Sequence, residues 1–118
     1  LINHEYVTVM ESSGLVAIRM FLIQLNEACG MLMEGIAAVE DIDRVLTVGF
    51  GHRIGVFRLA DQMGIEKIVK LLENMYEEYG SLKYKPSPLL LRMFRAKHFG
   101  INKGRGFYNY DESGNIVK

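Results

Sequence analysis

The stretch Gly49-Phe50-Gly51-His52-Arg53-Ile54-Gly55, which runs on into Leu59-Ala60-Asp61, is the most informative part of this 118-residue sequence. Its three glycines enclose a tight loop, because glycine adopts backbone conformations that other residues avoid. The apolar residues after the loop recur at helical spacing and stop at Gly64, so the sequence predicts a short helix there.

A second glycine-rich stretch, Gly100-Ile101-Asn102-Lys103-Gly104-Arg105-Gly106, lies near the C-terminus. A nucleotide-binding fingerprint needs a strand before it and a helix after it, whereas here a predicted helix precedes and aromatic residues follow. We therefore interpret this stretch as structural. Its glycines allow a close backbone approach, and the aromatic residues pack the C-terminus against the helices: Phe107, Tyr108 and Tyr110.

Upstream of the first loop, the apolar pattern predicts two helices. One begins at Leu15 and ends at Gly35, and its apolar residues lie almost all round, so we expect it to be central and buried on more than one side. The other runs from Val39 to Leu46 with a weak N-cap, because Ala38 has no side-chain acceptor. Its first turn carries acidic residues that complement the helix dipole: Glu40, Asp41 and Asp43.

Downstream of the loop, two more helices are predicted. A regular apolar pattern extends from Ile65 to Tyr79 and is ended by Gly80. Ser87-Pro88 is an N-cap followed by proline at the first helical position, so a last helix starts there. We expect it to run to Gly100, with Lys97 and His98 in its final turn. The fold class is therefore all-α, a bundle of about five helices.

Charge and cysteine content limit the function classes. Lys plus Arg and Asp plus Glu number fourteen each, which predicts no nucleic-acid partner and no binding to an anionic membrane. The apolar run Leu15–Ile23 contains Arg19 and is too short to span a bilayer. Cys29 is the only cysteine, which excludes an internal disulfide and favours a reducing, cytoplasmic location for a buried thiol. No metal site is predicted, since no ligand spacing joins the histidines His4, His52 and His98.

Together with the first glycine-rich loop, four further motifs form one pattern: Gln24-Leu25-Asn26-Glu27-Ala28, Glu40-Asp41-Ile42-Asp43-Arg44, Lys85-Pro86-Ser87-Pro88 and Gly104-Arg105-Gly106-Phe107-Tyr108-Asn109-Tyr110. In this order and spacing, from about Val7 to Tyr110, the sequence resembles the C-terminal helical domain of the NAD-dependent 3-hydroxyacyl-CoA dehydrogenases. The resemblance implies a helical bundle similar to the C-terminal domain of 6-phosphogluconate dehydrogenases, preceded by a short extended segment. Residues 1–13, with a strand at Tyr6–Met10, then correspond to the end of a dinucleotide-binding domain and a linker, and residues 14–118 to the helical domain.

The resemblance also implies a division of labour. The helical domain dimerises and forms one wall of the acyl-CoA cleft, while an N-terminal dinucleotide-binding domain, in cis or in trans, binds NAD and supplies a His–Glu acid/base pair. The expected pathway is fatty acid or butanoate metabolism, with no cofactor and no catalytic residue in this chain. The alternative is a free-standing helical module for oligomerisation or ligand binding. A strand–Gly-x-Gly-x-x-Gly–helix encoded upstream of Leu1 would distinguish the two.

Three positions are substrate-cleft candidates: Ile18, His52 and Arg53. Ile18 stands where the resembled family carries an Asn that helps to hold the substrate, and an aliphatic side chain cannot make that hydrogen bond. The chain departs from the family at four other positions. Ser13, Arg53 and Val56 stand where the family commonly has proline, and Arg58 stands where it commonly has glutamate. The polar framework is kept, and we expect it to hold the fold: Arg19, Asn26, Glu27, Asp61 and Tyr108.

Overall fold

The computed structural model describes residues 13–117, and the predicted strand Tyr6–Met10 lies outside them. Five α-helices make up most of the described chain, which confirms the all-α prediction: α1 (Ser13–Met33), α2 (Val39–Arg44), α3 (Val56–Met63), α4 (Ile65–Tyr79) and α5 (Pro88–Arg95). Shorter elements connect them or follow them: a π-helical turn η2 (Val45–Gly49), two 3₁₀ turns η3 (Leu82–Tyr84) and η4 (Ile101–Lys103), and strands β1 (Asn109–Tyr110) and β2 (Ile116–Val117).

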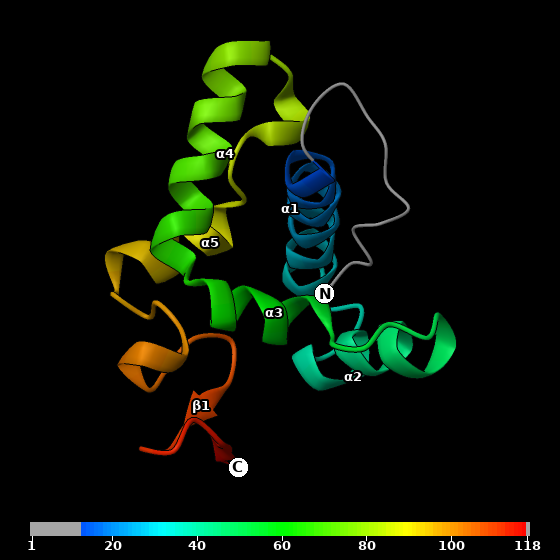
Figure 1. Ribbon diagram of the computed structural model, residues 1–118, viewed down its shortest axis with the longest axis vertical. Coiled ribbons are helices and arrows are strands. Elements are labelled where there is room, and N and C mark those ends of the chain that lie inside the picture. Colours follow the sequence, from blue (N-terminus) through cyan, green and yellow to red (C-terminus); the bar gives the residue numbers. More distant parts are fainter. Residues whose placement is uncertain (1–12, 118) are drawn as a thin grey trace.

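The short helix α3 lies at the centre of the molecule. It contacts α1, α2, α4 and η4, and Figure 1 shows it crossing between the α1 and α4 helices on one side and the C-terminal segment on the other. Its Phe57 and Ala60 are completely buried. The sequence had predicted α1 as the central helix, and this was wrong for the described chain. The buried residues of α1 form a single stripe at helical spacing: Leu22, Leu25, Ala28 and Cys29.

Three helix ends lie where the sequence placed them. The N–H of Ile36 donates to the Met31 carbonyl and the N–H of Gly35 to that of Leu32, a Schellman motif that Gly35 permits with φ 76°. Helix α4 ends at Gly80 in the left-handed conformation. At the start of α5, the Ser87 hydroxyl accepts from the Leu89 N–H at 3.3 Å.

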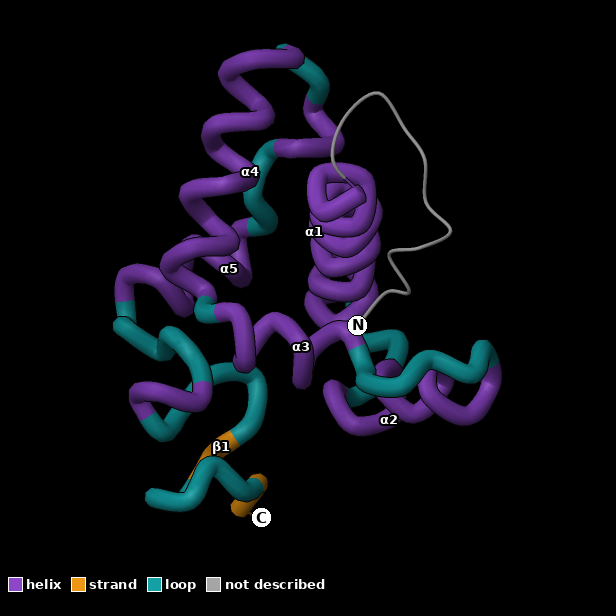
Figure 2. Tube along the Cα trace, in the orientation of Figure 1, coloured by secondary structure: helices purple, strands orange, loops and turns teal. Residues whose placement is uncertain are grey.

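Two helices end earlier than predicted. Helix α5 stops at Arg95 rather than Gly100, because Lys97 adopts φ 60° and the N–H of His98 turns back to the Met93 carbonyl. Its last turn therefore carries Arg92 and Arg95 instead of Lys97 and His98. Helix α2 ends at Arg44 and continues as the wider π-helical turn η2. Figure 2 colours both as helix, near the label of α2.

A two-stranded hairpin at the C-terminus was not predicted from the sequence. Asn109 pairs with Val117 and Tyr110 with Ile116 in antiparallel register. The Asp111 carboxylate closes the turn by accepting from the N–H groups of Ser113 and Asn115, each at 2.9 Å. Each strand has only two residues, so the apolar alternation that identifies a strand in a sequence cannot appear.

Helix α1 is long and apolar enough to cross a membrane by length and composition. Its 18-residue window Val16–Met33 has a mean hydropathy of 1.3. The run Leu15–Ile23 considered in the sequence therefore underestimated the length of the apolar segment. A core helix meets the same criterion, and the buried stripe of α1 packs inside the core with residues of α3, α4 and α5.

Candidate functional site

Asp43 joins three segments beside the first glycine-rich loop. Its Oδ1 accepts from the Phe57 N–H at 2.9 Å, and its Oδ2 accepts from the Arg58 N–H at 3.1 Å and from the Tyr108 hydroxyl at 2.7 Å. Asp43 therefore caps the N-terminus of α3, where backbone N–H groups lack helical partners. The sequence placed Asp43 in the first turn of α2. Asp43 does lie in α2, but after the first turn, whose acidic residues are Glu40 and Asp41.

Asp61 holds the second glycine-rich stretch in a similar way. Its carboxylate accepts from the N–H groups of Phe107 at 2.8 Å and Tyr108 at 3.0 Å, and from the Tyr110 hydroxyl at 2.6 Å. A Cβ on Gly106 would lie 2.0 Å from Oδ1, so only glycine permits this approach. Burial raises the pKa of Asp61, and these hydrogen bonds oppose the rise. The tail is structural, as predicted from the sequence.

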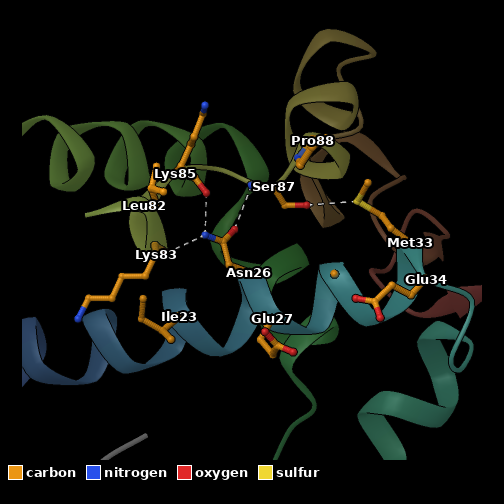
Figure 3. Close-up of a pocket in the computed structure, with 11 residues that line it drawn as sticks. Ile23, Asn26, Glu27, Met33, Glu34, Leu82, Lys83, Lys85, Ser87 and Pro88 are labelled. Atoms are coloured by element: carbon orange, nitrogen blue, oxygen red, sulfur yellow. Dashed lines mark hydrogen bonds between the residues drawn. The ribbon is translucent and has the colours of Figure 1, made fainter. Parts of the chain in front are cut away.

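Asn26 and Arg19 fasten the α4–α5 connection to α1. The Asn26 amide donates to the carbonyls of Lys83 at 3.1 Å and Lys85 at 2.9 Å, and its oxygen accepts from the Ser87 N–H at 3.1 Å, as Figure 3 shows. The Arg19 guanidinium donates to the Tyr84 hydroxyl.

Glu27, next to Asn26 in the sequence, does not fasten α1 to another segment as Asn26 and Arg19 do. It is exposed on the wall of an open groove of about 490 Å³, the one drawn in Figure 3. Its side chain makes no hydrogen bond or ion pair within residues 13–117. The expectation that Glu27 holds the fold was therefore wrong.

A different groove, between α1 and the segment from the first loop into α3, brings two of the three cleft candidates together. It has a volume of about 310 Å³, and His52 and Arg53 lie on its wall. The Gln24 amide adds a third polar group. The rest of the lining is apolar: Met20, Phe21, Ile54, Val56 and Leu59. We call this cavity the α1–α3 groove.

The third candidate, Ile18, is not part of the lining of the α1–α3 groove. It is half-buried, packs against the core, and precedes Leu22, Leu25 and Cys29 on the buried stripe of α1. The sequence could not show that Ile18 lies outside this lining, because helical spacing alone does not say which neighbour each face of a helix contacts.

The side chains at the groove differ in what they offer to a ligand. His52 is exposed. Its backbone N–H donates to the Leu46 carbonyl at 3.0 Å, and the centroid of its ring lies 6.3 Å from that of the Phe50 ring. Arg53 is also exposed and reaches the groove from the loop.

Cys29 does not line the groove and lies on the buried stripe of α1. Burial raises the pKa of the Cys29 thiol to about 12, so this side chain stays protonated and unreactive at neutral pH.

Within residues 13–117, no three His, Cys, Asp or Glu side chains gather as metal ligands. The α1–α3 groove combines an apolar wall with a guanidinium, an imidazole and an amide, which suits a ligand with apolar and anionic parts. Fold and groove together define an all-α domain with an open groove of mixed apolar and polar lining.

Comparison with known proteins supplies the family. Residues 14–110 match the family described as 3-hydroxyacyl-CoA dehydrogenase, C-terminal domain, and the chain belongs to it. This confirms the resemblance found in the sequence.

Relatives and solved structures agree with this assignment. The chain is 36% identical over 111 residues to a 3-hydroxybutyryl-CoA dehydrogenase of Clostridioides difficile, covering 94% of this chain and 40% of that protein. It is similar to the crystal structure of FadB2 from Mycobacterium tuberculosis, with a TM-score of 0.77 and 38% identity over 79% of this chain and 33% of that one. The (S)-3-hydroxybutyryl-CoA dehydrogenase of Ralstonia eutropha also gives a TM-score of 0.77, with 36% identity over 80% and 33% of the two chains. The chain thus spans about two-fifths of the length of the curated relatives it matches.

Proposed function

We propose that this chain works as the C-terminal domain of a 3-hydroxyacyl-CoA dehydrogenase and forms one wall of its acyl-CoA cleft. The observation that carries the proposal is the α1–α3 groove, where apolar side chains lie beside His52 and Arg53. An acyl-CoA has both kinds of chemistry, since an apolar acyl chain is linked to a polyanionic nucleotide. The names of the relatives support the same substrate class.

In this proposal the redox step depends on a separate dinucleotide-binding domain. When bound there, NAD would supply the hydride acceptor for oxidation of the 3-hydroxyl carbon, and a base on that domain would take the hydroxyl proton. The described part of this chain offers no cradle for the dinucleotide in its glycine-rich tail, because the Asp61 carboxylate already accepts from the N–H groups of Phe107 and Tyr108. The role left to this chain is to position the acyl part and to exclude water from it.

The proposal includes a homodimer formed through the outer face of α1. Three apolar side chains on and beside α1 are exposed, Val16 at 37%, Met20 at 69% and Leu82 at 73%. Val16 and Met20 line a further open groove together with Arg19 and Tyr84, so they belong to one surface. Exposed apolar surface of this kind favours association. We place the protein in the cytoplasm, where a reducing environment suits the free thiol of Cys29.

A chimera tests the cleft role. The dinucleotide-binding part of the C. difficile relative is joined to this chain in place of its own C-terminal domain, and NADH-dependent reduction of acetoacetyl-CoA is followed by the loss of NADH absorbance. We expect turnover to exceed that of the dinucleotide-binding part alone by about a hundredfold or more, because substrate orientation contributes factors of this size.

Two histidine variants refine the chimera test. His52→Ala, on the groove, should raise the KM for acetoacetyl-CoA several-fold. His98→Ala, beyond the end of α5, should leave it unchanged. A chimera that folds and dimerises but is no more active than the dinucleotide-binding part alone would contradict the cleft role. It would favour the alternative of a non-catalytic binding or oligomerisation module.

A further inference from the structure

Two arginines line a second cavity, which shares Arg53, Ile54 and Leu59 with the α1–α3 groove. This cavity has a volume of about 400 Å³ and is lined by Arg53, Ile54, Arg58, Leu59 and Gln62. Arg58 and Gln62 lie four residues apart on α3 and so project from the same face of the helix. The lining includes no acidic side chain.

Neither guanidinium is neutralised within residues 13–117. The only ion pair there joins Lys70 to Glu66 on α4. The Nε of Arg58 is buried and has no hydrogen-bond partner among the described residues. A buried polar atom without a partner is rare in folded proteins, and two guanidinium groups that line one cavity favour an anion there.

Acidic residues do lie nearby, on a neighbouring cavity that Arg53 and Arg58 also line: Glu40, Asp41 and Asp43. The Asp43 carboxylate accepts from the N–H groups of Phe57 and Arg58 and from the Tyr108 hydroxyl, and it forms no ion pair within 4.0 Å with either guanidinium. Glu40 and Asp41 are exposed and form no ion pair within 4.0 Å with either arginine. The positive charge of the arginine cavity is thus available to a ligand.

We propose that Arg53, Arg58 and Gln62 form a binding site for a phosphate group. The planar guanidinium fork matches the oxygen spacing of a phosphate and donates two hydrogen bonds to it, and the Gln62 amide adds a neutral donor. Arg53 and Leu59 line both this cavity and the α1–α3 groove, so a ligand can occupy the two together. If the proposed function holds, the phosphate belongs to the coenzyme A part of the substrate; otherwise the site binds a free phosphate.

The test is calorimetric titration of the 118-residue chain with inorganic pyrophosphate, with coenzyme A and with pantetheine, which lacks the nucleotide phosphates. We expect saturable binding of pyrophosphate and of coenzyme A, in competition with each other, and none of pantetheine. Arg53→Gln and Arg58→Gln should each weaken pyrophosphate binding by about tenfold or more, as expected for a lost charged hydrogen bond. Arg92→Gln on α5 removes the same charge elsewhere and should have no effect.

The outcomes separate this site from the proposed function. Binding of pyrophosphate without binding of coenzyme A would support the phosphate site and contradict its assignment to the acyl-CoA substrate. No saturable binding of either ligand, or an equal loss of affinity with Arg92→Gln, would overturn the site, whatever the activity of the chimera. Arg58→Lys keeps the charge without the planar fork and should bind pyrophosphate more weakly than the unmodified chain, which a purely ionic attraction would not show.

Discussion

At the scale of single residues, two aspartates connect parts of the chain that are distant in sequence. Asp43 binds α3 and the C-terminal tail, and Asp61 binds the tail alone. Both residues stood out in the sequence as parts of motifs, but their partners lie up to 65 residues away along the chain. Local patterns of apolar and turn residues carry no information on such pairs, which explains why the sequence placed Asp43 in α2 but missed that its side chain caps α3.

Asp61→Asn should lower the free energy of unfolding by about 2–4 kcal/mol, because the amide leaves buried donors without an acceptor. The carboxylate now accepts three hydrogen bonds, and the amide NH₂ would point at one or more of the donors. Urea unfolding measures the change. Asp111→Asn is the matched control, since Asp111 also accepts from two N–H groups but is exposed, so its loss should be much smaller. Equal losses in both variants would contradict this role of Asp61.

At the scale of elements, the sequence predicted the helices well where a local signal ends them. Gly35, Gly80 and the Ser87-Pro88 pair each place a helix boundary correctly. It failed at α5, because the left-handed residue there is Lys97, and nothing in a lysine indicates a positive φ. It also missed the C-terminal hairpin, which is held mainly by the turn at Asp111 rather than by a strand pattern.

Lys97→Gly should stabilise the chain by about 0.5–1 kcal/mol, because glycine adopts the positive φ of this position without the strain of a Cβ. The substitution keeps the N–H of residue 97, which donates to the Phe94 carbonyl at 3.1 Å. Ala96→Gly is the control, since Ala96 has right-handed helical geometry and gains nothing from glycine. Thermal unfolding compares the two variants. Destabilisation by Lys97→Gly would show that the end of α5 differs from that described here.

The junction between α2 and α3 depends on the absence of a side chain at residue 55. Gly55 has φ −73°, which any residue adopts, but a Cβ there would lie 2.1 Å from Asp43 Cγ. Gly55→Ala should therefore displace the Asp43 carboxylate from the start of α3 and cost about 2–3 kcal/mol. At Gly49 a Cβ would meet nothing closer than Val45 Cγ1 at 3.9 Å, so Gly49→Ala should cost little. Similar denaturant midpoints for both variants would rule out this packing.

At the scale of the whole molecule, the sequence identified the family, and two of the three residues that it proposed for the cleft, His52 and Arg53, line one groove. His52 was selected as the histidine of the glycine-rich loop and Arg53 as a departure from the family's proline; they are neighbours in the chain, and both line the α1–α3 groove. Ile18 was selected through the resemblance, and it lies on the core side of α1 instead of on that wall. The second arginine, Arg58, was seen as a departure from the family and not as a partner of Arg53, because their shared cavity forms only once α3 is folded.

The proposed dimer predicts an unequal effect of charge on two exposed apolar surfaces. Met20→Glu on α1 should weaken self-association by about tenfold or more, because a carboxylate buried in an apolar interface loses its hydration. Val48→Glu introduces the same charge on η2, where Val48 is 72% exposed against 69% for Met20, and should have little effect. Sedimentation of the chain at several concentrations measures both. The reverse result would move the interface to η2, and a clean monomer at all concentrations would contradict the dimer.

The central claim is that the α1–α3 groove forms a wall of the acyl-CoA cleft, and amide hydrogen exchange in the chimera tests it most directly. With acetoacetyl-CoA at saturation and NADH absent, the account predicts slower exchange over residues 20–24 and 52–59, which carry the groove, and unchanged exchange over α4 (Ile65–Tyr79). Saturating substrate that leaves exchange in both groove segments unchanged would contradict the account.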